Sequence, residues 1–502
     1  MSPVSRRRFL ASSASFFATG PAFGQRARTP APAPIEVDAI IVGAGAAGIA
    51  AARRLSAAGR SFTLVEASNR IGGRCVAETT SFGVPFDRGA HVIYTPDSNP
   101  LIRLASRTGL EIYAAPSAQR IRIGRRNARE SELEDYLVAS GRASRAIADA
   151  ARGRADADCL SAMPRGLGEW RSTVEFALGP YGSGKELNEI SAMDLSRAAD
   201  RAAGAFCRQG YGALLAKLAE GIPVSLDTAV KLVDITGRGT KVEASTTKGT
   251  VTGRHIIITA STNAILDRMK FDGGLPKRYQ DALERLKLGS FDHIALELKG
   301  NPLGLQRDDL VIEKSSGLRT AGLLANVGGT PLTVVEVGGK FGRDLAEQGD
   351  KAMTEFAVEW LSGMFGAGVK KALQRTQATQ WKKDPWALGA FASASPGGQG
   401  ARRILMEPIR NRVFFAGEAV HETMYGTVGG AWVSGTRAAE AVIRHIMGQP
   451  EPAAPKAEIE VLSEKKPARA APFGERPAPG SAGGWCYTNP DSSFCKPSRH
   501  NP

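Results

Sequence analysis

Three glycines near the start of the chain have the spacing G-x-G-x-x-G. They are Gly43, Gly45 and Gly48, and the helical segment that follows begins with residues of the same motif, Ala46 and Ala47. Glycines at this spacing permit a tight turn, a close approach of the backbone to a pyrophosphate, and close packing of helix on strand. The first turn of such a helix offers N–H groups and a positive dipole end to phosphates.

The residues around this turn predict a strand, a helix and a second strand within about 30 residues. An apolar run at 37–42 precedes the glycines, Gly59 marks the end of the helix, and a second apolar run at 62–65 ends in Glu66. A carboxylate at the end of the second strand can accept hydrogen bonds from the hydroxyls of an adenosine ribose. These elements together predict dinucleotide binding rather than a structural Gly-rich turn.

A second glycine pair indicates which dinucleotide is bound. Gly72, Gly73 and Arg74 follow directly after the second strand. An NAD site has no general need for this turn, whereas in an FAD site the glycines let the backbone touch the cofactor and Arg74 can neutralise pyrophosphate charge. Ala67 and Arg70 belong to the same expected site. The two motifs together resemble the flavin-containing amine oxidase family, which includes monoamine and polyamine oxidases and flavin-dependent histone lysine demethylases.

The resemblance implies an α/β fold with a Rossmann-like FAD-binding domain of the GR2 type and an interleaved α+β substrate domain. The 502 residues and their 42% hydrophobic content suffice for two domains with large cores. The expected segments are a twin-arginine signal peptide at 1–24, a tether at 25–35, the FAD-binding domain at 36–97, 206–264 and 386–448, the substrate domain at 98–205 and 265–385, and a Pro/Ala-rich linker with a Cys-containing tail at 449–502.

Further FAD contacts are implied by the resemblance alone. At Gly89 and Ala90 the backbone would pass against the isoalloxazine, and His91 would lie near the ring, although a histidine with a structural hydrogen bond is an equally open reading. The N-terminus of a late helix would place N–H groups at flavin O2 and N1, where negative charge develops on reduction. The other expected contacts are Val230, Gly417, Glu418, Thr427 and Val428.

Three residues are candidates for catalysis by the same resemblance. In monoamine and polyamine oxidases a lysine four residues after a glycine holds a water against flavin N5, and here the residue four after Gly289 is His293. Histidine can also hold a water and can exchange protons near pH 7; a shifted register or a core histidine is the alternative. Trp386 and Phe391 occupy aromatic positions of a stretch resembling the family's W-x-x-D-P-Y-x-x-G-x-Y. Trp386 and Tyr425 are therefore expected at the substrate site, and a core tyrosine is the other reading of Tyr425.

These features predict oxidation of an amine, in which hydride passes from the carbon bearing nitrogen to flavin N5 and leaves an imine that water hydrolyses. The alternatives are a desaturase-type or L-amino-acid-oxidising flavoenzyme, or a non-catalytic FAD-bound maturation or interaction protein. FAD is expected to be non-covalent, because no counterpart is visible of the late cysteine that carries flavin in some family members. The five cysteines show no zinc-type spacing, and no metal site is expected. Oxygen and a periplasmic redox protein are both open as electron acceptor.

The N-terminus predicts export. Its Ser-Arg-Arg-Arg-Phe-Leu sequence, with Arg6 and Arg7, resembles the twin-arginine signal, and the small residues Ala22 and Gly24 suit cleavage before Gln25. A periplasmic location follows. In the tail, Cys486 and Cys495 could close a small loop by a disulfide there, and the tail is either a docking element for a partner or inert.

The composition bears on other partners. The formal net charge is +15, to which the leader contributes, and a second arginine cluster at 120–129 lacks the interleaved aromatics that stack on bases. No nucleic-acid partner is expected. No apolar run approaches the length of a membrane span.

Overall fold

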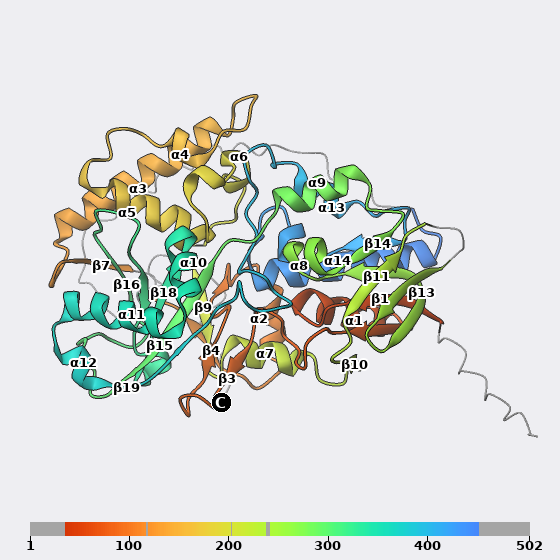
Figure 1. The fold of residues 1–502 in the computed structure, drawn as a ribbon, viewed down its shortest axis with the longest axis horizontal. Helices are drawn as coiled ribbons and strands as arrows, with labels where there is room; N and C mark the ends of the chain where they lie inside the picture. Colours follow the sequence, from red (N-terminus) through yellow and green to blue (C-terminus); the bar gives the residue numbers. More distant parts are fainter. Residues whose placement is uncertain (1–35, 117–118, 202, 237–240, 451–502) are drawn as a thin grey trace, which may run out of the picture. The chain divides into compact units, whose positions relative to one another are not determined.

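The computed structural model describes residues 36–450 apart from 117–118, 202 and 237–240 (Figure 1). The predicted signal peptide, tether and cysteine pair of the tail lie outside the described residues. Within those residues, no helix has both the length and the apolar character that crossing a membrane requires.

A mixed sheet carries the Gly-rich motif. In spatial order its strands are β10 (Val224–Ser225), β2 (Phe62–Val65), β1 (Glu36–Val42), β13 (Gly249–Ile258), β12 (Val242–Thr246), β11 (Val230–Asp234) and β14 (Lys270–Asp272), and β20 (Val413–Phe415) also pairs with β13. The strands from β10 to β13, together with β20, run parallel. On β1, Ala39 and Ile41 face one core and Ile40 and Val42 face another, as expected for a parallel sheet buried on both faces.

Helices cover both faces of this sheet. On one side lie α1 (Ala46–Ala57), α2 (Pro100–Ala105), α7 (Tyr211–Leu218) and α14 (Val428–Ile446). On the other lie α8 (Thr262–Arg268), α9 (Lys277–Arg285) and α13 (Ala401–Met406). Helices α1 and α14 approach so closely that a Cβ added to Gly435 would lie 2.0 Å from the Ala47 carbonyl oxygen. The late helix is thereby held against the helix that follows the first Gly-rich turn.

A second, mostly antiparallel sheet is built from segments inserted between those of the first. In spatial order its strands are β19 (Leu373–Ala378), β15 (Phe291–Leu298), β18 (Leu332–Gly338), β17 (Gly322–Leu324), β16 (Leu310–Glu313), β7 (Gln119–Ile123) and β8 (Arg126–Asn127). The helices α10 (Gly339–Gln348), α11 (Asp350–Phe365) and α12 (Gly368–Ala372) contribute to the core on one face. The long helix α3 (Glu130–Ala150) packs against the β7–β16 end (Figure 1). The predicted α/β fold with an interleaved second domain is confirmed.

Short elements join the two sheets. The remaining strands are β3 (Ala77–Glu78), β4 (Phe86–Asp87), β5 (Ile93–Tyr94), β6 (Ile112–Ala114) and β9 (Gly204–Cys207). The remaining helices are α4 (Cys159–Ala162), α5 (Arg171–Phe176) and α6 (Ala192–Leu195), with short helical turns at Gly168–Trp170, Ala177–Tyr181, Leu187–Glu189, Val327–Gly329 and Glu418–Val420.

The first sheet continues past the predicted boundary at residue 264. Strand β14 pairs in parallel with β11, and α9 packs into the core beneath the sheet. Sequence pattern gave no reason to place β14 there, because a three-residue edge strand has too few positions to show a period.

Candidate functional site

The first Gly-rich turn has the geometry that its spacing predicts. Gly43 has φ +101°, in the region that favours glycine. A Cβ on Gly48 would lie 1.8 Å from the Gly43 carbonyl oxygen, so only glycine lets the helix approach the turn. At Gly45 an added Cβ would meet no atom closer than 4.0 Å, which leaves the backbone open to a ligand. The first turn of α1, with Ala46 and Ala47, follows directly.

The second Gly-rich turn lies directly against the first. Gly45 and Gly72 form a parallel bridge, and the Gly72 N–H donates to the Ala44 carbonyl at 2.9 Å. Gly72 and Gly73 have φ +97° and +58°, so both need the freedom of glycine. Arg70 Nη1 donates to the Gly73 carbonyl at 2.8 Å and closes this turn. Two motifs that are separate in sequence therefore form one backbone surface.

Glu66 lies at the end of β2 beside the first turn. Its carboxylate accepts hydrogen bonds from Ala44 N at 2.7 Å and from Ser68 N and Oγ at 2.9 and 2.8 Å. The Glu66 carbonyl accepts from Thr228 N at 2.7 Å, which brings the start of β11 and Val230 to the same end of the sheet. The predicted cofactor contacts that meet here are Gly43, Gly45, Ala46, Ala47, Gly48, Glu66, Ala67, Arg70, Gly73 and Val230.

An open groove of about 500 Å³ lies beside this end of β2. Val65 and Thr228 contribute to its lining, together with the hairpin that joins β12 to β13.

Arg74 links this region to the C-terminal part of the chain. Its Nη1 donates to the Glu418 carboxylate at 2.9 Å and to the Ala390 carbonyl at 2.5 Å. The same carboxylate accepts from Ala392 N at 3.2 Å and Gly426 N at 3.1 Å. Glu418 is buried, so its charge is balanced by Arg74 and these N–H groups. Arg74 thus already has a carboxylate partner in the structure, which the expected pyrophosphate role did not include.

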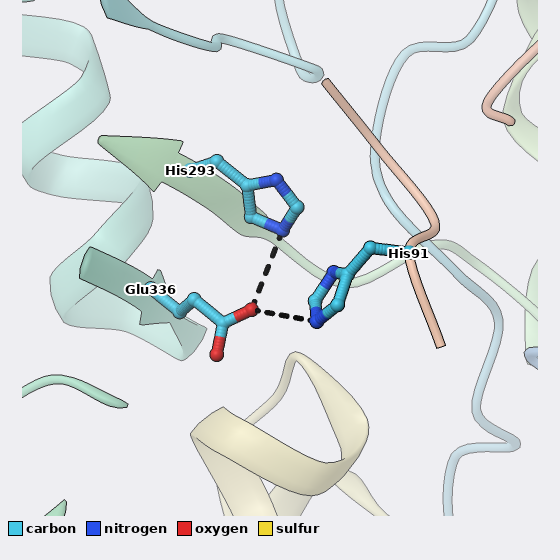
Figure 2. Close-up of side chains that lie close together, drawn as sticks. All are labelled: His91, His293 and Glu336. Atoms are coloured by element: carbon cyan, nitrogen blue, oxygen red, sulfur yellow. Dashed lines mark ion pairs between the residues drawn. The ribbon is translucent and has the colours of Figure 1, made fainter. Parts of the chain in front are cut away.

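The backbone at Gly89 passes close to Arg74. A Cβ added to Gly89 would lie 2.1 Å from the Arg74 carbonyl oxygen, and Ala90 N donates to that oxygen at 3.0 Å. Small residues are therefore required at Gly89 by the protein's own backbone. The side chain of His91, two residues after Gly89, points toward His293 and Glu336 (Figure 2).

The N-terminus of α14 is the remaining part of the predicted cofactor site. Thr427 caps the helix, because its side-chain oxygen accepts from Gly430 N at 2.9 Å, and Val428 is the first helical residue. Gly417 follows β20 with φ +131°, and its N–H donates to Ser434 Oγ at 2.9 Å. The helix end thus lies next to the segment that carries Glu418.

His91, His293 and Glu336 form a buried cluster (Figure 2). His293 on β15 and Glu336 on β18 are direct cross-strand partners, and both point to the face of the sheet opposite Ile294 and Val335. The Nε2 atoms of His91 and His293 lie 3.4 and 3.5 Å from Glu336 Oε1. The other carboxylate oxygen of Glu336 accepts from the Tyr181 hydroxyl at 2.8 Å. Residues from four distant segments meet here.

Burial determines the protonation of this cluster. It lowers the pKa of His91 and of His293 to about 4 and raises the pKa of Glu336. His293 Nδ1 lies 3.1 Å from the Asp87 carbonyl oxygen, which can only accept, so Nδ1 carries the proton. The lone pair of a neutral His293 is therefore on Nε2, which faces Glu336. His91 likewise has a backbone hydrogen bond at Gly89.

Aromatic rings surround the two histidines. The His91 and His293 ring centroids are 5.1 Å apart, and His91 stacks on Phe206 at 6.1 Å. Phe291 lies 5.9 Å from His293 and 5.7 Å from Phe391. Of the two aromatic positions in the late tryptophan-rich stretch, it is Phe391 that reaches this region.

In the described chain, neither Trp386 nor Tyr425 makes a ring contact with the histidine cluster. The Trp386 side chain is 37% exposed and stacks on no other ring in the described part of the chain. Tyr425 is buried, its hydroxyl donates to the Asp194 carbonyl at 3.2 Å, and the Arg402 guanidinium carbon lies 3.6 Å from its ring centroid. These contacts of Tyr425 are the ones expected of a core tyrosine, which is the alternative prediction for this residue. A catalytic role for either aromatic stays a prediction.

Sequence reasoning missed Glu336, Tyr181 and the Arg402–Asp194 pair. A signal was present for Glu336, since it interrupts the apolar run of β18. A carboxylate inside a strand that is otherwise fully buried needs a partner. For Arg402 and Asp194 the sequence held no comparable signal.

The chain is similar in sequence to a known protein family and to individual members of known function. Residues 46–443 match the family described as flavin containing amine oxidoreductase. Among relatives, lysine-specific histone demethylase 2 of Homo sapiens is 26% identical over 436 residues, covering 80% of this chain and 53% of its own length. Probable polyamine oxidase 4 of Arabidopsis thaliana is 25% identical over 442 residues, covering 82% of this chain and 88% of its own. The chain thus spans about half the length of the histone demethylase.

Solved structures share the fold. Cyclohexylamine oxidase from Brevibacterium oxydans IH-35A superposes with a TM-score of 0.70 at 20% identity, over 82% of this chain and 100% of its own. Wild-type putrescine oxidase bound to putrescine gives a TM-score of 0.70 at 17% identity, over 82% of this chain and 99% of its own.

Proposed function

The chain belongs to the family of flavin containing amine oxidoreductases, and from that premise we propose that it oxidises a small-molecule amine with a non-covalently bound FAD. The observation that carries the proposal is the direct contact between the two Gly-rich turns. A site for any dinucleotide needs only the first turn. The second turn packs against the first and extends the backbone surface toward Arg74 and the buried histidines.

The residues fit FAD by their own geometry. The open backbone at Gly45 and the first turn of α1 would receive the pyrophosphate, and Glu66 would exchange its bonds to Ala44 and Ser68 for ribose hydroxyls. The backbone at Gly89 would lie along the isoalloxazine. The N-terminus of α14 would offer N–H groups to its pyrimidine edge.

The protein's part in the chemistry is positioning and exclusion of water. When bound, the flavin supplies a two-electron acceptor for the hydride on the carbon that carries the amine nitrogen. His293 would hold the water that hydrolyses the imine product, because its Nε2 is an unprotonated acceptor fixed by the Nδ1–H bond to the Asp87 carbonyl. Phe291 and Phe391 would keep other water away from this reaction.

The buried arginines favour a simple amine over an amino acid. An amino-acid oxidase needs a buried guanidinium for the substrate carboxylate. In the described chain the two buried arginines are both engaged: Arg402 pairs with Asp194, and Arg122 donates to the Met364 and Arg125 carbonyls. Neither is available to a substrate.

Anaerobic titration tests the proposal. The purified flavoprotein would be mixed without oxygen with cyclohexylamine, putrescine, an N-methylated lysine peptide and an L-amino acid, while flavin absorbance is followed. We expect bleaching with at least one of the simple amines and none with the amino acid. Bleaching by the amino acid alone favours the amino-acid-oxidising alternative, and no bleaching with any compound contradicts the proposal. Admitting oxygen or a periplasmic redox protein afterwards identifies the acceptor.

The state of the cofactor has its own test. Because no late cysteine matches a flavin attachment site, acid precipitation should release yellow FAD into the supernatant. Colour that stays in the pellet shows a covalent bond.

We propose that the enzyme is exported to the periplasm by the twin-arginine route, which carries folded, cofactor-loaded proteins. Replacing Arg6 and Arg7 by lysine should leave FAD-loaded protein in the cytoplasm. Unchanged periplasmic activity would refute the assignment.

The tail at 449–502 is proposed to be dispensable for FAD binding, whether it docks a partner or is inert. Deleting 450–502 should leave the flavin spectrum intact, and loss of FAD on deletion would show that the tail belongs to the core. In periplasmic protein the thiols of Cys486 and Cys495 should react only after reduction, and free thiols would exclude the disulfide.

A further inference from the structure

Three side-chain atoms that can bind a metal ion converge at the histidine cluster. His91 Nε2, His293 Nε2 and Glu336 Oε1 all lie within 4.8 Å of one another. Glu336 is 1% exposed, yet its Oε1 accepts no hydrogen bond from any described residue. Leaving such an atom unpaired is unfavourable, because it has lost water without gaining a partner. A cation shared by the three atoms would remove that cost.

The spacing discriminates between possible cations. A proton shared between His and Glu needs a separation of about 2.5–3.0 Å, and the two Nε2–Oε1 distances are 3.4 and 3.5 Å. A tetrahedral ion with bonds of about 2.0–2.1 Å places its ligands about 3.4 Å apart. An ammonium group or a water at about 2.8 Å from each ligand would place them about 4.6 Å apart. The two His–Glu distances match the metal ion, and the third pair of ligand atoms lies within 4.8 Å.

We propose that His91, His293 and Glu336 bind one divalent metal ion of the zinc class. Two imidazoles and one carboxylate are a ligand set that suits zinc, and three protein ligands leave a coordination position for water. The two rings approach the carboxylate oxygen from one side, as the close-up shows (Figure 2).

The surrounding hydrogen bonds orient the ligands as metal sites require. The Asp87 carbonyl fixes the proton of His293 on Nδ1 and leaves Nε2 for the ion. Tyr181 donates to Glu336 Oε2 at 2.8 Å, which leaves Oε1 as the single ligand atom of this carboxylate.

The site uses the same Nε2 atom of His293 to which the proposed function assigns a water, so with the ion bound that water would occupy the open coordination position of the ion. The site itself does not depend on amine oxidation. Its test is therefore metal content rather than turnover. The purified FAD-containing full-length protein would be equilibrated with one equivalent of Zn²⁺ and dialysed against metal-free buffer, and zinc measured by mass spectrometry. We expect about one zinc per chain, and an X-ray absorption spectrum of nitrogen and oxygen ligands with two imidazoles and no sulfur.

Variants assign the ion to the cluster. Glu336→Gln, which keeps the side-chain shape, and His293→Ala should each lower zinc affinity more than 100-fold. Tyr181→Phe, which removes only the outer hydrogen bond, should lower it by about 10–100-fold. The control is His445→Ala: His445 also faces a second histidine, His255, at 5.2 Å between ring centroids, but these two have no carboxylate between them. Its zinc content should equal that of the parent.

Two experimental outcomes would contradict the proposed metal site. No zinc uptake by the parent protein, or a zinc content unchanged in Glu336→Gln, overturns the proposal. Far-UV circular dichroism and the flavin spectrum show whether each variant is folded. Should Glu336→Gln be misfolded, Tyr181→Phe carries the test, because an unchanged affinity in that variant also overturns the proposed geometry.

Discussion

The ion pair between Arg402 and Asp194 is the most deeply buried charge pair near the proposed flavin site. The two side chains are 2% and 1% exposed, and they make two parallel hydrogen bonds, Nε–Oδ1 at 2.8 Å and Nη2–Oδ2 at 2.7 Å. Arg402 Nη1 also donates to the Ala419 carbonyl at 2.8 Å, directly after Glu418. Removing the guanidinium should therefore affect both the stability of the fold and the retention of FAD.

The magnitude follows from what Arg402→Met leaves behind. Methionine keeps most of the apolar stem, so packing changes little, while the Asp194 carboxylate retains the Ala394 N–H at 3.0 Å but loses its counter-charge. Breaking a buried pair in this way costs about 3–5 kcal/mol. We expect Arg402→Met to lower the free energy of unfolding by that amount and to lose FAD on gel filtration. Adding Asp194→Asn removes the stranded charge and should restore at least about 1–2 kcal/mol.

Equilibrium denaturation in urea, followed by circular dichroism and by flavin fluorescence, measures these changes. Arg54→Met is the matched control, because Arg54 pairs with Glu440 at 3.2 Å with side chains 37% and 41% exposed. An exposed pair of this kind should cost at most about 1 kcal/mol. The reasoning is refuted if Arg402→Met lies within about 1 kcal/mol of the parent, or if the double variant is no more stable than Arg402→Met.

Three further predictions concern single sites. Gly48→Ala should abolish FAD binding, because its Cβ would lie 1.8 Å from the Gly43 carbonyl oxygen. The control Gly363→Ala, where a Cβ meets no atom within 4 Å, should retain FAD. Equal FAD content in the two variants would contradict this prediction. His293→Ala should keep FAD bound but slow turnover by about 10²–10⁴-fold, with a smaller effect on KM, and near-normal steady-state turnover would remove His293 from the site. Burial lowers the pKa of Lys185 from 10.5 to about 8, so between these pH values the unfolded chain binds more protons than the folded chain. Burial of the charged lysine therefore destabilises the fold fully below about pH 8, and this destabilisation fades as the pH rises toward 10.5. We therefore expect the free energy of unfolding of Lys185→Met, measured in urea, to exceed that of the parent by more at about pH 7 than at about pH 10.5. The change in this difference between the two pH values should reach up to about 3 kcal/mol. A difference that does not depend on pH would show that Lys185 is not desolvated.

Local spacing was enough to predict the geometry of the first Gly-rich turn. The turn at Gly43, the close approach at Gly48 and the acid at Glu66 all depend on residues within a short stretch of chain, where steric limits on the backbone act directly. The N-terminal cap of α14 at Thr427 is local in the same way. Fold class followed, because strand, helix and strand in this order favour parallel pairing of the two strands, as β1 and β2 show.

The tertiary structure alone decided which distant side chains meet. Alternation along β15 predicts that His293 and Ile294 face opposite sides, but it does not reveal that Glu336 lies directly across on β18. That pairing depends on the register of two strands separated by 33 residues or more of intervening chain. It also depends on the backbone at Gly89, which brings His91 into the same interior. Buried chemistry of this kind is set by long-range packing, since the cost of an unpaired polar atom arises only once the surrounding segments have excluded water.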